Sequence, residues 1–222
     1  MSTVAPGSGR GYPRRMATDE SSTFRRIYQS AGRPEALPWH REEPPALLTE
    51  ALEGRTGPGR ALDLGCGAGT FSIYLARKGY EVTGVDFTPE ALRMAEERAR
   101  AAGVSVRLVE ADVAAWTGGE GFDVVLDSGC LHSLPPAKRA TYKQRLLSWL
   151  APAGDYVLVH FGRRHFLDWR PMGPRRQRRA EVVAELGPEL REIAYREQFL
   201  DVPLPIGPTI LIGEYRFRMA AK

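Results

Sequence analysis

From residue 60 onward, short apolar runs alternate with longer amphipathic stretches. Five apolar runs have the length and composition of buried strands: 60–64, 81–86, 104–110, 122–127 and 156–161. The stretches between them include three with helical periodicity: 70–78, 88–102 and 136–150. Because strands that alternate with helices of this length form parallel sheets, we predict an α/β fold with a doubly wound sheet.

The two ends of the chain depart from this alternation. Residues 178–186 predict one more helix, but 190–199 and 209–219 predict two strands with no helix between them, an antiparallel pair at the sheet edge. Before the alternation, 22–31 and 44–52 predict helices. Residues 1–20 are rich in Ser, Gly, Pro and Arg, and we expect a disordered tail. The remainder, 21–222, is predicted to be a single domain.

Composition narrows the class of protein. The 222 residues are 43% hydrophobic and 26% charged, which is typical of a soluble globular domain. Two cysteines, Cys66 and Cys130, exclude a disulfide framework and favour a reducing, cytoplasmic location. No apolar run is long enough to span a bilayer, and no secretory signal is visible at the N-terminus.

The net charge of +4 is concentrated in one segment. Residues 163–179 contain seven arginines and one acid, a local charge of +6, so the rest of the chain carries −2. Pro171, Gly173 and Pro174 interrupt regular structure there. The segment reads either as a solvated loop or as a lid that attracts an anionic acceptor or a nucleic acid.

The strongest motif follows the first strand. Residues 62–70 read LDLGCGAGT, so Gly65, Gly67 and Gly69 form a turn that leads into a helix. Glycines let a ligand approach the backbone closely, and the start of the helix offers free amides. Asp86 stands 21 residues beyond Gly65, at the end of the second strand. An acid in that position accepts hydrogen bonds from the ribose of an adenosine.

Two classes of ligand fit such a turn. A dinucleotide motif requires glycine at its sixth position, where this chain has Thr70. Asp63 within the first strand and Asp112 after the third add two further acids to Asp86. Acids around a nucleoside pocket repel a pyrophosphate and suit a cationic cofactor, S-adenosylmethionine.

The order of these motifs resembles the class I S-adenosylmethionine-dependent methyltransferases over residues 60–162. The resemblance implies a Rossmann-like, doubly wound, seven-stranded sheet whose last strand is antiparallel. It also implies a set of cofactor contacts. Asp63, Gly65, Cys66, Gly67 and Gly69 would line the methionine moiety; Asp86 would hold the ribose, with Phe87 beside it; Asp112 and Val113 would meet the adenine.

A finer resemblance lies in residues 122–135, FDVVLDSGCLHSLP, and in 36–45 with Trp39. Both are similar to the small-molecule branch that contains thiopurine, thiol and halide methyltransferases. This similarity implies that Asp127 and Ser128 also border the cofactor, that 21–56 form a helical lid, and that Trp39 closes over the cofactor. The arginine-rich insertion at 163–179 has no counterpart in that branch.

Acceptor groups should lie beyond the carboxyl ends of the fourth and fifth strands. His132 and His165 are the candidate catalytic residues, and His160 is expected to be a core residue. The candidate substrate contacts are Tyr28, Cys130, His132, Arg163, Arg164 and His165. No spacing of Cys and His predicts a metal site.

The Asn-Pro-Pro-Tyr motif used on flipped bases is absent after the fourth strand. The sequence therefore predicts methylation of a small molecule, with an anionic acceptor as one option. The alternatives are nucleic-acid methylation through the arginine-rich segment and a non-catalytic S-adenosylmethionine-binding module.

Overall fold

The computed structural model describes residues 20–53, 55, 57, 59–163, 175–201 and 209–220. The predicted tail at 1–20 lies outside this part except for its last residue. In chain order the elements are α1 (Glu20–Ala31), the 3-10 turn η1 (Pro34–Ala36), α2 (Ala46–Glu53), β1 (Arg60–Leu64), α3 (Thr70–Arg77), β2 (Glu81–Asp86), α4 (Pro89–Ala101), β3 (Arg107–Glu110), β4 (Phe122–Ser128), η2 (Leu131–Ser133), α5 (Pro136–Trp149), β5 (Leu150–Phe161), α6 (Arg179–Leu186), β6 (Leu190–Asp201) and β7 (Thr209–Met219).

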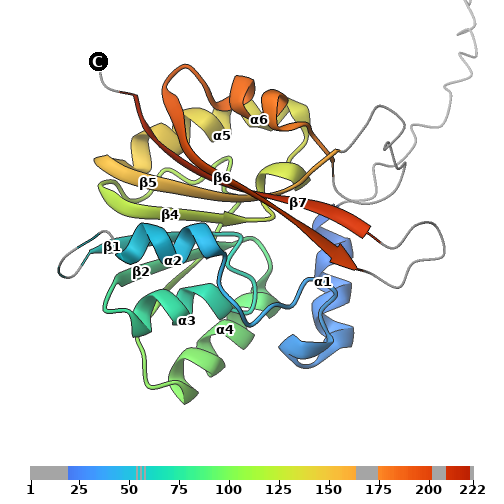
Figure 1. The fold of residues 1–222 in the computed structure, drawn as a ribbon. Helices are drawn as coiled ribbons and strands as arrows, with labels where there is room; N and C mark the ends of the chain where they lie inside the picture. Colours follow the sequence, from blue (N-terminus) through green and yellow to red (C-terminus); the bar gives the residue numbers. More distant parts are fainter. Residues whose placement is uncertain are drawn as a thin grey trace, which may run out of the picture.

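The described strands form one seven-stranded sheet in the order β3-β2-β1-β4-β5-β7-β6 (Figure 1). Strands β1 to β5 are parallel to one another, whereas β7 runs antiparallel to both β5 and β6. The prediction of a doubly wound sheet with an antiparallel last strand is confirmed. The carboxyl ends of β1, β2, β4 and β5 therefore share one edge, where ligands bind in open α/β sheets.

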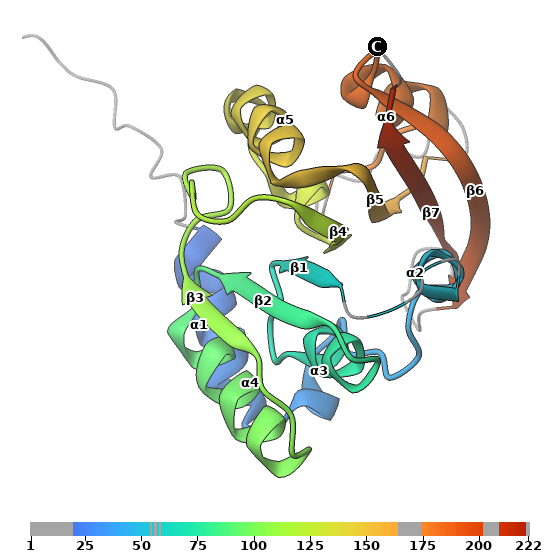
Figure 2. The same cartoon turned by 90° about the vertical axis from the view of Figure 1, so that its left-hand side faces the viewer.

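Helices cover both faces of the sheet, as Figure 2 shows edge-on. Alternate residues of each strand point to opposite faces. Leu62 and Leu64 belong to the core under α5 and α6, whereas Ala61 belongs to the core under α2 and α3. Asp63 shares the face of Ala61, which directs an acid toward α3.

Two predicted strand limits were wrong. β5 begins at Leu150 instead of Tyr156, because Pro152 disfavours helical backbone at the residue before it, and Leu150 already pairs with Phe122. β3 begins at Arg107 instead of Val104. The amide of Val104 closes α4 by donating to the Ala99 carbonyl, so that residue is not available to the sheet.

Candidate active site

The glycine turn joins β1 to α3 at the carboxyl edge of the sheet. Gly65, Gly67 and Gly69 have φ angles of 65°, 54° and 75°, a region that only glycine enters freely. The amides of Gly65 and Cys66 donate to the Val85 carbonyl at 2.8 and 3.0 Å, which ties the turn to β2. Gly69 is the N-cap of α3, so the first amides of that helix face the turn.

Asp86 connects the end of β2 to the same turn. Its Oδ2 accepts from the Gly67 amide at 2.9 Å, and its Oδ1 accepts from the Thr88 amide at 2.8 Å. The side chain is buried, and burial raises the pKa of the carboxyl despite these bonds. A carboxylate has about four lone-pair sites, so both oxygens can still accept from a ligand.

Asp63 lies beneath the turn and is buried from solvent. Its Oδ2 accepts a 2.6 Å hydrogen bond from the hydroxyl of Ser72 on α3. Burial raises the pKa of this carboxyl to about 7, and the charge of nearby Asp86 contributes to the rise. A neighbouring cation would favour ionisation of Asp63, so the site suits a positively charged group.

An aromatic lid covers the turn from the side of α1. The Tyr28 hydroxyl lies 2.6 Å from the position that a Cβ atom on Gly67 would take. Trp39 contacts Tyr28 and Phe24, with ring centroids 5.7 and 5.5 Å apart, and Phe24 meets the edge of Phe87 at 5.8 Å. Tyr28, expected to contact the acceptor, therefore lies directly on the predicted cofactor turn.

The lid helix α1 packs against α4 (Figure 2). Gln29 donates to Glu90 at 2.8 Å, and the Arg25 guanidinium lies 3.5 Å from the same carboxylate. One acid on α4 thus holds two residues of α1 and fixes how Tyr28 meets the turn.

Asp112 follows β3 and is half-exposed beside the turn region. Its Oδ2 forms a 2.6 Å ion pair with Lys138 on α5, and its Oδ1 accepts from the Ala114 amide at 2.9 Å. Burial alone would raise the pKa of the carboxyl, but the bonds from Lys138 and Ala114 lower it overall. Val113 is buried in the core under α5.

Asp127, at the end of β4, is fully buried and serves internal donors. It accepts from the amides of the following loop and from two tyrosine hydroxyls: Gly129, Cys130 and Leu131 donate from the backbone, and Tyr142 (2.5 Å) and Tyr156 (3.3 Å) from their side chains. Burial raises its pKa against these bonds. The carboxylate thus shapes the loop after β4 and does not line an open space.

The loop after β4 lies directly against the glycine turn. The sulfur of Cys130 is 3.1 Å from the position of a Cβ on Gly65. Burial and the charge of Asp127 raise the pKa of the Cys130 thiol well above its usual value, so it is not a thiolate at neutral pH. Ser128 is half-buried and pairs with Val159 of β5.

Two histidines meet at the carboxyl ends of β4 and β5. The rings of His132 and His160 stand edge to face with centroids 5.3 Å apart, and Phe161 lies 4.6 Å from the ring of His132. His160 Nδ1 is 2.8 Å from the Phe161 carbonyl, so that nitrogen carries the proton. His132 Nδ1 and His160 Nε2 are buried and have no hydrogen-bond partner within the described chain. Buried polar atoms without partners are uncommon and point to a ligand or water.

Both imidazoles are neutral at pH 7. Burial lowers the pKa of His160 to about 4, and it lowers the pKa of His132 well below its usual value. The guanidinium of Arg139 contributes to both shifts. Arg139 donates hydrogen bonds to Gln177 at 2.8 Å and to Glu185 at 3.0 Å, and these bonds fix the position of its charge relative to the two histidines.

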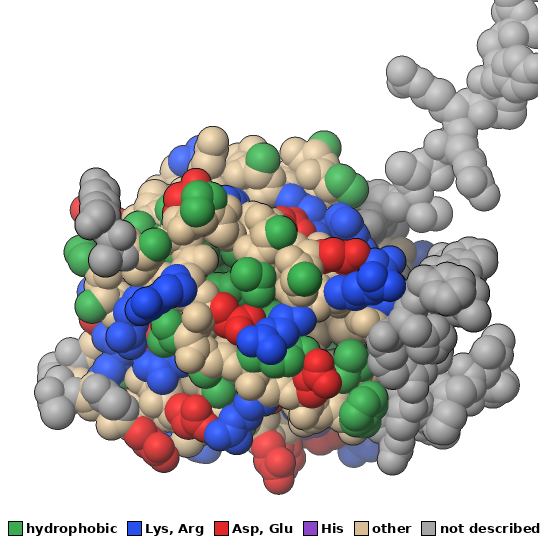
Figure 3. Space-filling view, turned by 45° about the horizontal axis from the view of Figure 1, so that its top comes forward, with side chains coloured by type: hydrophobic (Ala, Val, Ile, Leu, Met, Phe, Trp, Pro, Cys, Tyr) green, Lys and Arg blue, Asp and Glu red, His purple; other side chains and the backbone are tan. Residues whose placement is uncertain are grey.

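The described part of the arginine-rich segment is bound to the body. Arg163 pairs with Glu181, and Arg179 pairs with Glu192 and lies 4.3 Å from the ring of Tyr195. On the face shown in Figure 3, basic and acidic side chains lie interspersed. Two other candidates, Arg164 and His165, lie outside the described residues.

Sequence reasoning missed three features of this site. They are the buried Nε2 of His160, which has no partner among the described residues, the ion pair of Lys138 with Asp112, and the hydrogen bond from the Tyr142 hydroxyl to Asp127. Of these, only His160 could have been found from the sequence, because it lies near the carboxyl end of a predicted strand. No cluster of three or more potential metal ligands occurs among the side chains that the structure describes.

A doubly wound sheet with a glycine turn after β1, an acid at the end of β2 and a lid over the turn is typical of nucleoside-binding α/β proteins. Comparisons with known proteins narrow this class. A family model described as a methyltransferase domain matches residues 61–154. A 2-heptyl-1-hydroxyquinolin-4(1H)-one methyltransferase of Mycobacteroides abscessus is 32% identical over 178 residues, which are 78% of this chain and 72% of the relative.

Solved structures of similar proteins are also methyltransferases. The 1,6-didemethyltoxoflavin-N1-methyltransferase of Burkholderia thailandensis, determined with 1,6-didemethyltoxoflavin and S-adenosylhomocysteine, is 26% identical with a TM-score of 0.67, and the match covers 97% of this chain and 93% of that one. A Methanosarcina mazei methyltransferase shares the fold at a TM-score of 0.68 and 21% identity, over 81% and 100% of the two chains. The chain belongs to the class I S-adenosylmethionine-dependent methyltransferases, and S-adenosylmethionine is its cofactor.

No described helix is both long and apolar enough to cross a membrane.

Proposed function

We propose that the protein transfers a methyl group to a nitrogen, oxygen or sulfur atom of a small heteroaromatic molecule. The observation that carries this proposal is the pair His132 and His160. His132 lies in the loop after β4, two residues beyond Cys130, which contacts the glycine turn, and His160 lies near the carboxyl end of β5; each ring has one buried nitrogen without a hydrogen-bond partner in the described chain. Neutral imidazoles accept hydrogen bonds and protons, which suits an acceptor that arrives as N–H, O–H or S–H.

The residues around the turn fit the cofactor. Because Gly65, Gly67 and Gly69 have no side chains, a ligand can approach the backbone of the turn, and Asp86 has lone pairs for a ribose. Asp63 would face the methionine ammonium, while Asp112 and Lys138 would border the adenine. Phe87, Trp39 and Tyr28 would cover the bound molecule. Asp127 would act through the loop that it holds, with Ser128 beside it.

S-adenosylmethionine supplies an electrophilic methyl group on a sulfonium. His132 Nδ1 would accept the proton of the acceptor N–H, O–H or S–H as that atom takes the methyl group, and the sulfonium would leave as the neutral thioether of S-adenosylhomocysteine. Because the pKa of His132 lies well below its usual value, this base removes only a fairly acidic proton. Azoles, N-hydroxy heterocycles, phenols and thiols meet that requirement better than aliphatic alcohols do.

Relatives support this class of acceptor. The relative from Mycobacteroides abscessus is a 2-heptyl-1-hydroxyquinolin-4(1H)-one methyltransferase, and the enzyme from Burkholderia thailandensis is an N1-methyltransferase of 1,6-didemethyltoxoflavin. An acceptor that binds through the arginine-rich segment has less support, because Arg163 and Arg179 are already paired with acids. The same ion pairs argue against nucleic-acid methylation.

A methyl-transfer screen tests the proposal. Purified protein with S-adenosylmethionine is offered N-hydroxyquinolones, azoles, phenols, thiols and aliphatic alcohols, and the methylated products are detected by mass spectrometry. We expect activity on acidic heteroaromatic groups and none on aliphatic alcohols. If S-adenosylhomocysteine binds in calorimetry but no acceptor is methylated, the chain is a cofactor-binding module and the proposal fails.

A further inference from the structure

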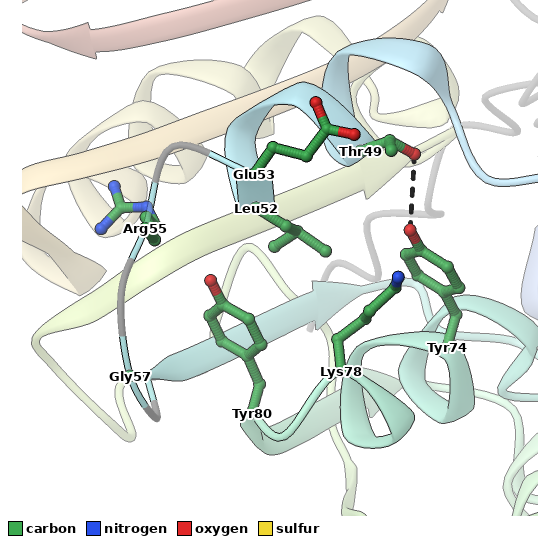
Figure 4. A pocket seen from close by; sticks show the side chains of 8 residues that line it. All are labelled: Thr49, Leu52, Glu53, Arg55, Gly57, Tyr74, Lys78 and Tyr80. Atoms are coloured by element: carbon green, nitrogen blue, oxygen red, sulfur yellow. Dashed lines mark hydrogen bonds between the residues drawn. The ribbon is translucent and has the colours of Figure 1, made fainter.

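The hollow at the amino ends of β1 and β2 is lined by polar side chains that do not converge (Figure 4). Arg55 and Lys78 lie on opposite sides of it, so no single ligand group meets both cations. The carboxyl ends of β4 and β5 show a different arrangement. There, buried polar side chains beside the segments that carry His132 and His160 bond to one another, and the methyl-transfer site as described so far does not explain why.

Gln177 is the centre of these contacts, and it is only 2% exposed. Its amide donates to the Phe161 carbonyl at 3.2 Å, and its own carbonyl accepts from the Arg163 amide at 3.0 Å. Its side-chain oxygen accepts from Arg139 at 2.8 Å, while its side-chain nitrogen donates to Glu185 at 2.7 Å. Burial of a polar residue is costly unless its groups are bonded, and here the backbone and both ends of the side chain are. Gln177 therefore connects β5 to α5 and α6.

His160 is joined to Gln177 through one oxygen atom. The Phe161 carbonyl accepts from the Gln177 amide at 3.2 Å and from His160 Nδ1 at 2.8 Å. A carbonyl oxygen has two lone pairs, so it can hold both donors at once. The bond to Nδ1 fixes the tautomer of the imidazole and leaves the buried Nε2 as an acceptor without a partner in the described chain.

The loop that carries His132 is held by neighbouring residues of the same region. The Arg175 amide donates to the His132 carbonyl at 3.3 Å, and Arg139 Nε donates to the Leu134 carbonyl at 3.1 Å. Residues 175–177 therefore contact both histidine-bearing segments, and Arg139 joins the loop to Gln177. The centroids of the two imidazoles are 5.3 Å apart, so a shift of either segment changes how the rings meet.

Arg139 and Glu185 bring opposite charges to the pair of histidines. The Arg139 side chain is 5% exposed, and its Nη1 lies 3.0 Å from the Glu185 carboxylate. Besides burial, the cation lowers the pKa of both imidazoles, and His160 also lowers that of His132. Glu185 acts in the other direction and raises the pKa of His160. Because Gln177 bonds to both charged groups, it helps to set where each charge lies.

We propose that Gln177 and Arg139 are positioning residues for methyl transfer, which fix His132 and His160 relative to each other. With Glu185 they also keep both imidazoles neutral and therefore able to accept a proton. Neither residue needs to touch the acceptor or the cofactor, because each acts through the histidines. This role rests on the proposed function of the two histidines.

The charges are tested by ¹⁵N NMR of the imidazoles in the full chain, titrated without acceptor and assigned with His160→Ala. Arg139→Gln should raise the pKa of His160 from about 4 toward the usual value near 6.5, because the cation is removed and Glu185 remains. Glu185→Gln should not raise it, because the acid is removed and the cation remains. Arg139→Lys should resemble the wild type, since it keeps the charge. A purely structural network predicts a rise in both glutamine variants, because either change would open the site to water.

Gln177→Met tests the positioning directly. It keeps the backbone bonds and the approximate volume of residue 177 but removes both side-chain bonds. We expect kcat to fall at least about tenfold, because the histidines are less well placed, while the affinity for S-adenosylhomocysteine is unchanged. Gln144→Met is the matched control, since Gln144 is an exposed glutamine on α5, and it should keep the wild-type kcat.

Three results would overturn the proposal: an unchanged pKa of His160 in Arg139→Gln, a rise of that pKa in Glu185→Gln, or full kcat in Gln177→Met. If Arg139→Gln does not fold, the other two variants still decide. The NMR titration needs neither acceptor nor turnover. It therefore separates a failure of this role from a failure of the proposed base, which full activity of His132→Ala would reveal.

Discussion

The hydroxyl of Tyr28 and the α-carbon of Gly67 are in such close contact that a methyl group on residue 67 would stand 2.6 Å from the tyrosine oxygen. The lid helix and the glycine turn therefore fit together only because residue 67 has no side chain. Gly67 also donates its amide to Asp86, so one glycine connects the lid, the turn and the acid after β2.

Gly67→Ala should separate these three parts. We expect the affinity for S-adenosylhomocysteine to fall at least tenfold, measured by calorimetry, because the new methyl group displaces Tyr28 and strains a backbone with φ of 54°. Gly103→Ala is the control. Gly103 has a similar φ of 67° but nothing within 4 Å of its Cβ position, so its variant should lose stability without losing cofactor affinity. Equal affinity losses in both would contradict this account.

Cofactor binding should release a proton from Asp63. In the free protein burial raises the pKa of Asp63 to about 7, so the carboxyl is largely protonated at pH 6. The ammonium of the ligand favours the ionised form, and affinity should therefore rise between pH 6 and pH 8. Calorimetry at pH 6.5 in buffers of different ionisation enthalpy measures the released proton.

Asp63→Asn keeps the volume and the hydrogen bond from Ser72 but cannot ionise. It should bind S-adenosylhomocysteine more weakly and without proton release. The same raised pKa predicts that the free protein loses stability as pH rises from about 4 to about 7, because only the folded state favours the protonated carboxyl. Unchanged proton release in the variant would assign the proton to another group.

His132→Ala should lower kcat about 100-fold, the lower end of what a general base contributes, without changing the affinity for S-adenosylhomocysteine. His160→Ala should have a smaller effect, and the two changes should not add, since the rings contact each other at 5.3 Å. Steady-state kinetics of both single variants and of the double variant, with a heteroaromatic acceptor that the wild type methylates, measures these effects. Full activity of His132→Ala would show that His132 is not the general base.

Tyr142→Phe should destabilise the fold by about 1.5–3 kcal/mol, because it removes a 2.5 Å hydrogen bond to the buried Asp127 carboxylate. Tyr156→Phe is the matched control, since its hydroxyl reaches the same oxygen at only 3.3 Å. In urea denaturation, the free energy of unfolding should be highest for the wild type, lower for Tyr156→Phe and lowest for Tyr142→Phe. The reverse order would show that the shorter contact is not the stronger bond.

The glycine turn, the position of Asp86 at the end of a strand and the doubly wound sheet with its antiparallel last strand were predictable, because each depends on residues close together in the sequence or on the regular alternation of strands and helices. Strand β5 was harder to delimit, since Pro152 and Gly154 resemble a loop, and only pairing with Phe122 shows that the strand starts at Leu150. Local composition contains no information about such a partner.

The packing around the predicted site residues could not be predicted from the sequence for a similar reason. Tyr28 was assigned to the acceptor, but the packing of α1 on Glu90 places it over Gly67. Asp127 resembles a ligand contact in sequence, and the structure surrounds it with internal donors. Both outcomes depend on where distant elements meet.

Gly162 and Gln177 pair as neighbours in a parallel bridge, with the Arg163 amide donating to the Gln177 carbonyl at 3.0 Å. The chain therefore leaves β5 and returns toward α6 at nearly the same point, and the buried contacts of Gln177 with Arg139 and Glu185 hold that closure. Replacement of the residues between them need not disturb the sheet. The register of β5 and the position of α6 therefore depend on Gly162, Arg163 and Gln177, and not on the sequence that connects Arg163 to Arg175.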